Sequence, residues 1–146
     1  MVLVVDIGNT NIVFGIFKEE KILVEFRIET SLQKQARDYE MNLRNFLLEA
    51  NLKASQFNKI ILSSVVPGLT SIMDTACLHL FRVKVLKAGP SIYPVLPLQI
   101  NNPQQIGTDL VANALAAFEM MKNLTIIIDF GTALTFTVVE ASGKIR

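Results

Sequence analysis

Short apolar runs recur along the first 28 residues of the chain. Three of them are separated by turn-forming or charged residues: Val2–Val5, Ile12–Phe17 and Ile22–Ile28. Apolar and β-branched runs of this length, bounded by such residues, are typical of strands that are joined by tight turns. The pattern therefore predicts that the chain begins with an antiparallel meander of strands.

The spacing of the apolar residues then changes to that of a helix. Apolar residues three or four positions apart predict helices over residues 37–50, Leu69–Phe81 and Thr108–Met121. Between these helices, mostly apolar runs at Lys59–Val66 and Val83–Leu86 predict two further strands. Strands that alternate with helices in this way favour parallel pairing.

The remaining segments complete the predicted order of elements. Ala88–Pro97 contains three prolines and one glycine and is predicted to be a loop. Thr125–Asp129 and Leu134–Val139 are predicted to form a closing β-hairpin. The predicted fold class is α/β: a mixed sheet, with an antiparallel meander plus parallel strands, and helices on both faces. Residues 1–122 are expected to form the first domain, and residues 123–146 the opening hairpin of an incomplete second domain.

Candidate chemistry lies where two of the predicted strands end. The sequence DIGNTN follows the first apolar run at residues 6–11, and nearly the same pattern, DFGTA, follows a later run at residues 129–133. Aspartate can hold Mg²⁺ directly or through water, and a glycine loop lets backbone N–H groups approach phosphate oxygens. Two such strand ends predict two related halves that face a shared polyphosphate.

The same residues also suit an ordinary turn. Val2–Val5 and Ile12–Phe17 can pair as a hairpin through a turn at Asp6–Thr10, because Asp, Gly, Asn and Thr are all frequent in turns. The two interpretations are compatible, since a phosphate-binding loop can itself be a hairpin turn. The second copy of the pattern is the observation that favours phosphate binding.

Composition limits the class of protein. The 146 residues suffice for one ordinary domain or two small ones, and 51% hydrophobic residues with a mean hydropathy of +0.41 supply material for a core. No apolar run approaches the ~18 residues of a membrane span, and no basic segment precedes the first apolar run as in a signal peptide. We therefore expect neither a membrane partner nor a secreted protein.

Charge and the reactive side chains narrow the class further. The net charge is +1 and the basic residues are scattered, which argues against a nucleic-acid partner. The single cysteine, Cys77, excludes an internal disulfide framework and fits a reducing, cytoplasmic compartment. The single histidine, His79, lies in a mixed helical stretch and is not expected to have a metal-binding or catalytic role.

Four segments of the chain follow one another in an order that matches a known family. They are DIGNTNIVFG at residues 6–15, SSVVP at 63–67, NPQQIGTDLVANA at 102–114 and IDFGTALTF at 128–136. Together they resemble the type III pantothenate kinases, also called the Baf family, of the acetate kinase, sugar kinase, Hsp70 and actin superfamily. This resemblance implies an actin-like, ribonuclease H-like fold.

The resemblance also implies an activity. Members of the family use ATP to phosphorylate the primary hydroxyl of pantothenate to 4′-phosphopantothenate, the first step of coenzyme A synthesis. They require Mg²⁺ and a monovalent cation (K⁺ or NH₄⁺), and they form homodimers. Asp109 matches the carboxylate that accepts the proton of the attacking hydroxyl, although an acid in the first turn of a helix also stabilises that helix. The residues carried over are Asp6, Gly8, Asn9, Thr10, Asn11, Gly131 and Thr132 for ATP and its phosphates, Gly107, Thr108 and Asp109 for the substrate, and Asp6 and Asp129 for the metal.

The sequence departs from the family pattern at four positions. Leu110 replaces an arginine, which removes a guanidinium that could bind polar groups of the substrate. Ile100 replaces a tyrosine, and Leu134 and Thr137 replace a threonine and an aspartate. The residues expected to contact the phosphates are thus kept, while polar residues expected to contact the substrate that accepts the phosphoryl group are lost. Three interpretations stay open: a pantothenate kinase, a kinase for a less polar acceptor, and a non-catalytic binding or regulatory partner of a complete kinase.

The family's chain continues well beyond the position that matches Arg146. A lone hairpin cannot bury both of its apolar faces by itself. We therefore expect a fragment, one subunit of a split enzyme or a degenerate homologue, which pairs as a homodimer or with a chain that supplies the second domain.

Overall fold

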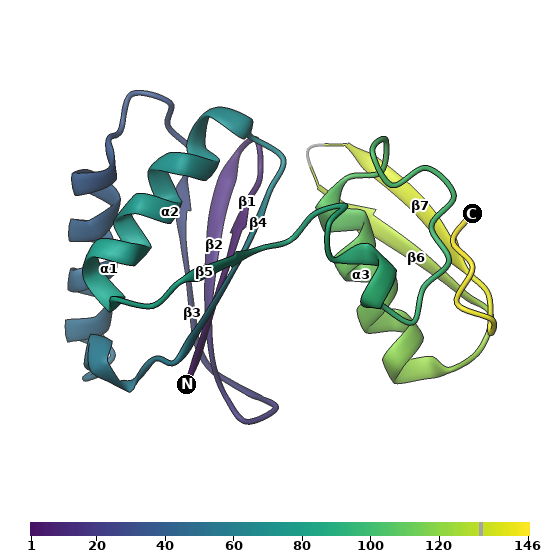
Figure 1. The fold of residues 1–146 in the computed structure, drawn as a ribbon, viewed down its shortest axis with the longest axis horizontal. Coiled ribbons are helices and arrows are strands. Elements are labelled where there is room, and N and C mark those ends of the chain that lie inside the picture. Colours follow the sequence, from purple (N-terminus) through teal and green to yellow (C-terminus); the bar gives the residue numbers. More distant parts are fainter. Residues whose placement is uncertain (132) are drawn as a thin grey trace. The chain divides into compact units, whose positions relative to one another are not determined.

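The computed structural model describes residues 1–131 and 133–146, and the chain in it divides into two compact units (Figure 1). Unit 1 is Met1–Lys87 and unit 2 is Ala88–Arg146. Each unit has its own cluster of buried hydrophobic residues. The units are described separately below.

Unit 1 is built on a five-stranded sheet with the order β3-β2-β1-β4-β5. β1 pairs antiparallel with β2 and parallel with β4, so it is the central strand, and β2 pairs antiparallel with β3. This arrangement confirms the predicted meander and the predicted parallel strands. The bounds are β1 Val2–Ile7, β2 Asn11–Lys18, β3 Lys21–Glu29, β4 Lys59–Ser64 and β5 Val85–Lys87.

Two helices of unit 1, α1 (Ala36–Glu49) and α2 (Pro67–Phe81), cover the same face of this sheet (Figure 1). Successive strand residues point to opposite faces, so Leu3, Val5 and Ile7 of β1 lie together on the covered face. The expected helices on both faces are not found in unit 1. The third predicted helix, which follows β5 in the chain, packs against the hairpin of unit 2 instead.

The core of unit 1 joins the meander to α1 through a stack of aromatic rings. The ring of Phe26 on β3 lies 4.4 Å from that of Phe14 on β2 and 3.8 Å from that of Phe46 on α1, measured between centroids. Offset aromatic contacts add to the stabilisation that burial provides. The hairpin β2–β3 is therefore packed against α1 on the covered face.

Unit 2 consists of one helix, one hairpin and the loop that precedes them. The helix is α3 (Thr108–Met121), and the hairpin is β6 (Thr125–Phe130) with β7 (Leu134–Val139), as predicted. The loop contains a short 3₁₀ turn at Tyr93–Val95 that was not predicted. The predicted domain boundary after residue 122 differs from the boundary between these units, but a compact unit need not be a domain of a longer protein, so the domain assignment stays a prediction.

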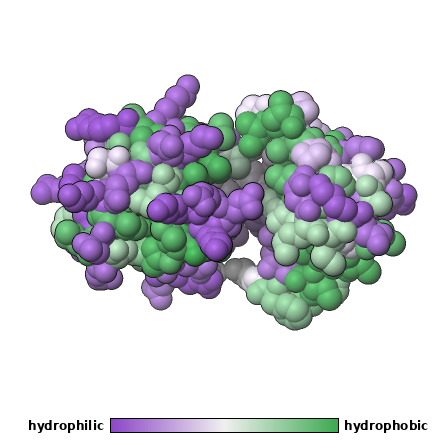
Figure 2. All heavy atoms as spheres, turned by 90° about the horizontal axis from the view of Figure 1, so that it is seen from below, coloured by the Kyte–Doolittle hydropathy of each residue, from purple (hydrophilic) through white to green (hydrophobic). Residues whose placement is uncertain are grey.

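The two faces of the hairpin β6–β7 differ. Ile127 and Val139 lie on the face that packs against α3. On the other face Ile126, Ile128 and Phe130 are 64%, 51% and 84% exposed. Hydrophobic residues reach the surface of both units in the space-filling view (Figure 2). None of the helices in the described ranges has the length and apolarity that a membrane crossing requires.

Candidate functional site

The turn between β1 and β2 contains the first group of predicted phosphate-binding residues. Gly8 N–H donates a hydrogen bond to the carbonyl of Asn11 at 2.9 Å, which closes the turn. Thr30 fixes it from the next strand end: its hydroxyl donates to the Gly8 carbonyl at 2.7 Å, and its N–H donates to the Thr10 carbonyl at 2.9 Å. Asn9 and Thr10 are exposed at the tip. The segment is thus a hairpin turn with an exposed polar tip, and phosphate binding stays a prediction.

Gly8 lies close to another backbone atom of this turn. A Cβ atom at residue 8 would lie 3.1 Å from the carbonyl oxygen of Asn11, which is tighter than nine in ten real contacts of this kind, so a larger residue would require a small shift. Its N–H is already used within the turn. Contacts to a phosphate would therefore come from the tip of the turn rather than from the Gly8 N–H.

Asp6 lies at the carboxyl end of the central strand, on the face opposite α1 and α2. The parallel register of β1 and β4 places Asp6 beside Ser63, which is buried. In α/β sheets, ligands bind at the carboxyl ends of parallel strands. Unit 1 therefore presents one carboxylate and one hydroxyl at the edge where such ligands bind.

Unit 2 brings the other two predicted carboxylates together along α3. The side-chain amide of Asn113 on α3 donates a hydrogen bond to the carboxylate of Asp129 on β6, at 3.1 Å. Asp109 is four residues before Asn113, so both lie on the same face of the helix. Thr135 on β7 is directly opposite Asp129. Asp109 and Asn113 on one face of α3, with Asp129 bonded to Asn113, are called the polar line of unit 2 below.

Asn113 was not among the predicted site residues. It occurred only as part of a family segment. Its signal in the sequence is that it is the one polar residue of 110–117, where every other residue is Leu, Val or Ala. A polar residue four positions after a candidate catalytic carboxylate, within an apolar helix, indicates a shared polar face.

The N-terminus of α3 fixes the carboxylate of Asp109. The helix begins at Thr108 after Gly107, and Asp109 Oδ1 accepts a hydrogen bond from the N–H of Leu110 at 2.9 Å. A Cβ atom at residue 107 would meet that same carboxylate oxygen, so a larger residue there would require the Asp109 side chain to shift. The interaction with the helix N-terminus is thus observed, and the catalytic role of Asp109 stays a prediction.

The second loop has the same length as the first by the strand bounds: residues 131–133 lie between β6 and β7, and residues 8–10 lie between β1 and β2. A Cβ atom at Gly131 would make only ordinary contacts, 3.7 Å from the carbonyl of Ala133. Thr132, a predicted ATP contact, lies outside the described residues.

All four positions that depart from the family pattern lie in unit 2. Leu110 is half-buried in the first turn of α3. Ile100 packs against the buried cluster of the unit, and Thr137 is buried on the face of β7 that α3 covers. Leu134 is 54% exposed. The isoleucine at position 100 therefore contributes to packing within unit 2.

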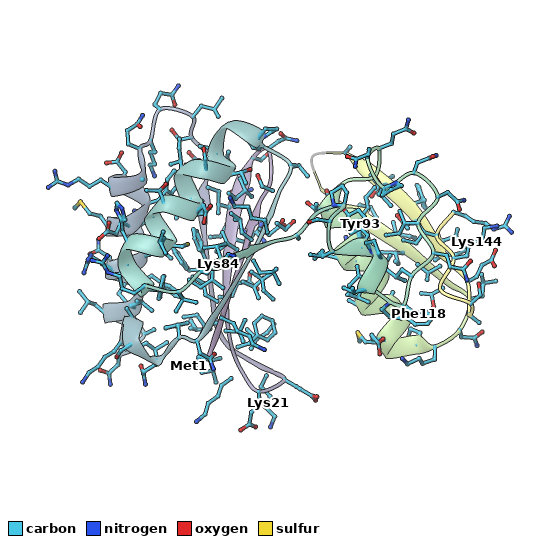
Figure 3. All side chains as sticks on the ribbon, viewed as in Figure 1. Met1, Lys21, Lys84, Tyr93, Phe118 and Lys144 are labelled. Carbon is cyan, nitrogen blue, oxygen red and sulfur yellow. The ribbon has the colours of Figure 1, made fainter. Side chains whose placement is uncertain are left out.

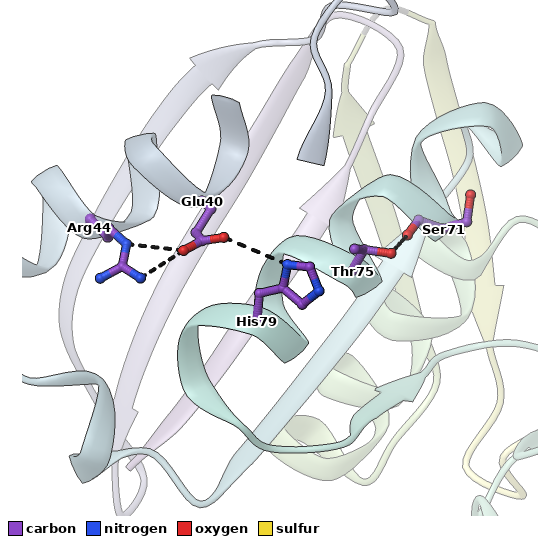
Figure 4. A network of polar contacts seen from close by, with 5 residues as sticks. All are labelled: Glu40, Arg44, Ser71, Thr75 and His79. Atoms are coloured by element: carbon purple, nitrogen blue, oxygen red, sulfur yellow. Dashed lines mark hydrogen bonds and ion pairs between the residues drawn. The ribbon is translucent and has the colours of Figure 1, made fainter. Parts of the chain in front are cut away.

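Unit 1 also has a surface pocket that contains none of the predicted site residues. Its lining includes Glu40, which pairs with Arg44 at 2.7 Å and lies 3.9 Å from His79 Nδ1 (Figure 4). Exposed pairs of this kind contribute about 0–1 kcal/mol to stability. Within residues 1–131 and 133–146, no three His, Cys, Asp or Glu side chains gather as a protein-only metal site requires.

Comparison with known proteins gives a family and relatives. The family model described as "Type III pantothenate kinase" matches residues 2–146. The chain is 41% identical over 143 residues to the type III pantothenate kinase of Listeria innocua, a match that covers 98% of this chain and 55% of that protein. It is 38% identical over 144 residues to that of Geobacter sulfurreducens, covering 99% and 56%. The chain thus spans about half the length of the curated relatives it matches.

Solved structures share the fold at low sequence identity. A putative N-acetylglucosamine kinase from Porphyromonas gingivalis matches with a TM-score of 0.53 and 19% identity, covering 100% of this chain and 46% of that one. A putative 2-dehydro-3-deoxygalactonokinase from Sinorhizobium meliloti matches with a TM-score of 0.52 and 13% identity, covering 97% and 50%. These matches confirm the predicted actin-like mixed sheet with a second hairpin.

Proposed function

Because the chain belongs to the type III pantothenate kinase family, we propose that it carries part of an ATP-dependent pantothenate kinase site. The reaction transfers the γ-phosphoryl group of ATP to the primary hydroxyl of pantothenate, and yields 4′-phosphopantothenate and ADP. The observation that supports this proposal best is the polar line of unit 2, in which α3 and β6 hold Asp109 and Asp129 on either side of Asn113.

Asp109 is proposed to be the general base. The alcohol donates its proton to the Asp109 carboxylate, its oxygen bonds to the γ-phosphorus, and the bond from that phosphorus to the β–γ bridging oxygen breaks. Phosphoryl transfer depends mainly on positioning and on stabilising charge on the equatorial oxygens, so a base that holds the alcohol in line is sufficient. Gly107 and Thr108 lie beside Asp109 at the start of α3 and are proposed to contact the acceptor.

The nucleotide phosphates are proposed to meet both strand ends. In unit 1 Gly8 would shape the turn, and the contacts would come from Asn9, Thr10 and Asn11. Thr30 fixes this turn, and its tip is exposed. In unit 2 they would come from Gly131 and Thr132. Short polar loops at the ends of strands suit phosphate because backbone and hydroxyl donors converge there.

Mg²⁺ suits the kind of donor that each strand end supplies. Mg²⁺ keeps several of its waters and is bound through one or two carboxylates plus the substrate phosphates, so a cluster of protein ligands is not required. Asp6 and Asp129 each supply one carboxylate. When bound, the ion neutralises charge on the phosphates, and the protein's contribution is to hold those carboxylates at the strand ends.

A monovalent cation, K⁺ or NH₄⁺, fits the surroundings of Asp129. The hydroxyl of Thr135, opposite Asp129, is buried and has no hydrogen-bond partner among the described residues. Carboxylate and hydroxyl oxygens can coordinate K⁺, and they accept hydrogen bonds from NH₄⁺. We propose that these two residues contribute to the binding of the cation.

The proposal is tested by exchanging the base. Purified chain is assayed for 4′-phosphopantothenate with ATP, Mg²⁺ and pantothenate, alone and together with a polypeptide that supplies the remaining length of the relatives. Asp109→Asn should reduce turnover by about 10²–10⁴-fold, the usual contribution of a general base. ATP affinity, measured by calorimetry, should change less than two-fold.

Two outcomes would count against the proposal. Full turnover with asparagine at position 109 would show that Asp109 is not the base. ATP binding without any phosphate transfer, even after the remaining length is supplied, would favour a binding or regulatory partner. If the chain is part of a kinase, we propose that its protein partner is a second copy or a chain that completes the second domain. We propose the cytoplasm as the compartment.

A further inference from the structure

Tyr93 is a buried residue of unit 2 with a polar atom at its tip. It begins the 3₁₀ turn Tyr93–Val95, and only 4% of its surface is exposed (Figure 3). Its side chain belongs to a buried cluster with Val111 and Ala114 of α3 and Val139 of β7. The ring is therefore held against the helix that carries Asp109.

The hydroxyl of Tyr93 is buried without a hydrogen-bond partner in the described part of the chain. A buried hydroxyl that is left unpaired destabilises the folded state, and native proteins keep few of them. Such a hydroxyl is available to a hydrogen-bond acceptor that moves toward it in another conformation of the site. Phe at this position would pack equally well and would avoid the unpaired atom.

Asp109 is a charged group close enough to act on this hydroxyl. Burial raises the pKa of Tyr93, and the carboxylate of Asp109 raises the same pKa further. The phenol therefore remains a protonated donor at neutral pH, with a carboxylate within electrostatic range.

Asp109 has room for a second donor. Its Oδ1 accepts the N–H of Leu110, and a carboxylate offers about four lone-pair positions in total. A buried phenol is well suited to be that donor because its ring cannot move away.

We propose that Tyr93 is a positioning residue for Asp109, and that the carboxylate turns to accept a hydrogen bond from the Tyr93 hydroxyl when the acceptor alcohol binds. This inference rests on the proposed kinase function. The hydrogen bond holds one carboxylate oxygen and leaves the other facing the alcohol, whose proton it accepts. The proton of Tyr93 stays on the phenol oxygen throughout.

Other titratable groups of unit 2 must be considered in any pH test. Asp129 on β6 lies one hydrogen bond away from α3, through Asn113. Beyond β7, Glu140 and Arg146 pair with each other, and Lys144 lies in the segment that bridges to Gln99. Asp129 is thus the neighbour whose effect has to be separated from that of Asp109.

The first test compares two buried tyrosines. Tyr39 in unit 1 donates its hydroxyl to the carbonyl of Ser31 at 2.9 Å, so Tyr39→Phe removes a satisfied hydrogen bond. Tyr93→Phe removes an unpaired hydroxyl. We expect Tyr39→Phe to lower the midpoint of thermal unfolding by about 4 °C, and Tyr93→Phe to leave it unchanged or raise it. An equal loss for both variants would mean that the Tyr93 hydroxyl is already bonded, which would overturn the proposal.

The second test measures the charge that Tyr93 senses. The ionisation of Tyr93 is followed by the NMR shift of its Cζ carbon. Asp109→Asn should lower the pKa of Tyr93, and Asp129→Asn should lower it less. An equal effect of both substitutions, or none, would show that Asp109 is not the neighbour of this hydroxyl. Neither result depends on turnover, so this test remains valid if the proposed kinase function fails.

The third test uses the kinase assay. Tyr93→Phe should lower kcat about ten-fold, the equivalent of one net hydrogen bond, with the KM for pantothenate within two-fold, and should move the acid limb of the kcat profile to higher pH. In the Asp109→Asn background it should have no further effect on residual turnover. A change in KM alone, or an undiminished effect in that background, would mean that Tyr93 does not act through Asp109. Tyr39→Phe serves as the matched control and should leave the pH profile in place.

Discussion

The two strand ends, Asp6 in unit 1 and Asp129 in unit 2, have almost the same local sequence and different surroundings. β1 is flanked by β2 and β4, so Asp6 lies beside Ser63 within a five-stranded sheet. β6 pairs with β7 in a two-stranded sheet, and Asp129 is held by a side chain from a helix. The same motif is therefore supported by strands in one unit and by α3 in the other.

The helices also cover opposite faces relative to the aspartate. In unit 1, α1 and α2 pack on the face of Ile7, the residue after Asp6, and Ile7 is fully buried. In unit 2, α3 packs on the face of Asp129 itself, and the following residue, Phe130, is 84% exposed. The face that forms the core of unit 1 thus corresponds to the exposed apolar face of unit 2.

The comparison shows how little of a site a motif determines by itself. An acidic residue at a strand end requires only a strand and a turn. Whether its neighbours are a hydroxyl, an amide or solvent depends on which element packs on that face. The predictions below test this difference, beginning with the largest effect.

The residues after the two aspartates should differ most in their contribution to stability. Ile7→Ala removes buried methyl groups from the core of unit 1 and should reduce the free energy of unfolding by about 2–5 kcal/mol. Phe130→Ala removes a larger side chain that is mostly exposed and should change it by less than about 0.5 kcal/mol. Urea unfolding of both variants measures the two values.

This pair has a clear contrary outcome. A loss of several kcal/mol for Phe130→Ala would show that the exposed face of β6–β7 is covered in solution by another part of the protein or by a second copy. Size-exclusion chromatography of the same variant would then show whether the state of association changes. Ile126→Ala and Ile128→Ala, on the same face, provide matched repeats.

Asn113 should be the residue on which the arrangement in unit 2 depends. Asn113→Asp replaces the amide donor to Asp129 with a second carboxylate at hydrogen-bond distance, so it removes an attraction and adds a repulsion. We expect a loss of about 1–3 kcal/mol in the stability of unit 2. Hydrogen exchange of the amides of β6 and β7 measures that loss.

A control separates this local effect from added charge. Asn101→Asp places the same new carboxylate on an exposed loop residue of unit 2 and should have little effect. Equal losses for the two variants would mean that net charge is responsible, and that the bond from Asn113 to Asp129 contributes nothing.

Most of the fold could be predicted from the sequence because its signals are local. The signals are the apolar runs of β1 and β2, the helical spacing of Tyr39, Leu43 and Phe46, and the proline-rich loop, and each depends on nearby residues. The faces that the helices cover could not be predicted, because the period identifies an apolar face but not its partner. The spacing from Asp109 to Asn113 was visible, yet the bond to Asp129 depends on how α3 packs on β6.

The ionisation of Cys77 makes the stability of unit 1 depend on pH. Burial raises the pKa of Cys77 to about 12, from 9.0, and no other cysteine occurs in the chain. The folded state retains this proton between those two values while the unfolded state loses it, so stability falls as pH rises from 9 toward 12. At pH 10 the loss should be about 1.4 kcal/mol relative to pH 8.

The variant Cys77→Ala removes this contribution and serves as the reference. The difference in unfolding free energy between wild type and variant should change between pH 8 and pH 10, when it is measured by exchange of the β1 and β2 amides. The β6 and β7 amides should show no such change if the two units open independently. A matching change in both hairpins would mean that the units unfold as one.

The two loop glycines give the smallest and most local comparison. Gly8→Ala places a Cβ atom 3.1 Å from the carbonyl of Asn11, within a turn that is closed by that same carbonyl. Gly131→Ala places it 3.7 Å from the nearest atom. Since overpacking of rigid backbone destabilises and ordinary contact does not, we expect a loss of about 1 kcal/mol for Gly8→Ala and almost none for Gly131→Ala, by urea unfolding.

The same pair of variants also separates structural from functional use of the glycines. If a glycine is needed only for the shape of its turn, its replacement by alanine should lower ATP affinity only to the extent that it also lowers stability. If Gly131→Ala weakens ATP binding in calorimetry without a loss of stability, then residue 131 is glycine because the nucleotide approaches its backbone closely. If neither property changes, the glycine of the second motif is required by nothing in unit 2, and the resemblance between the two strand ends is limited to their aspartates.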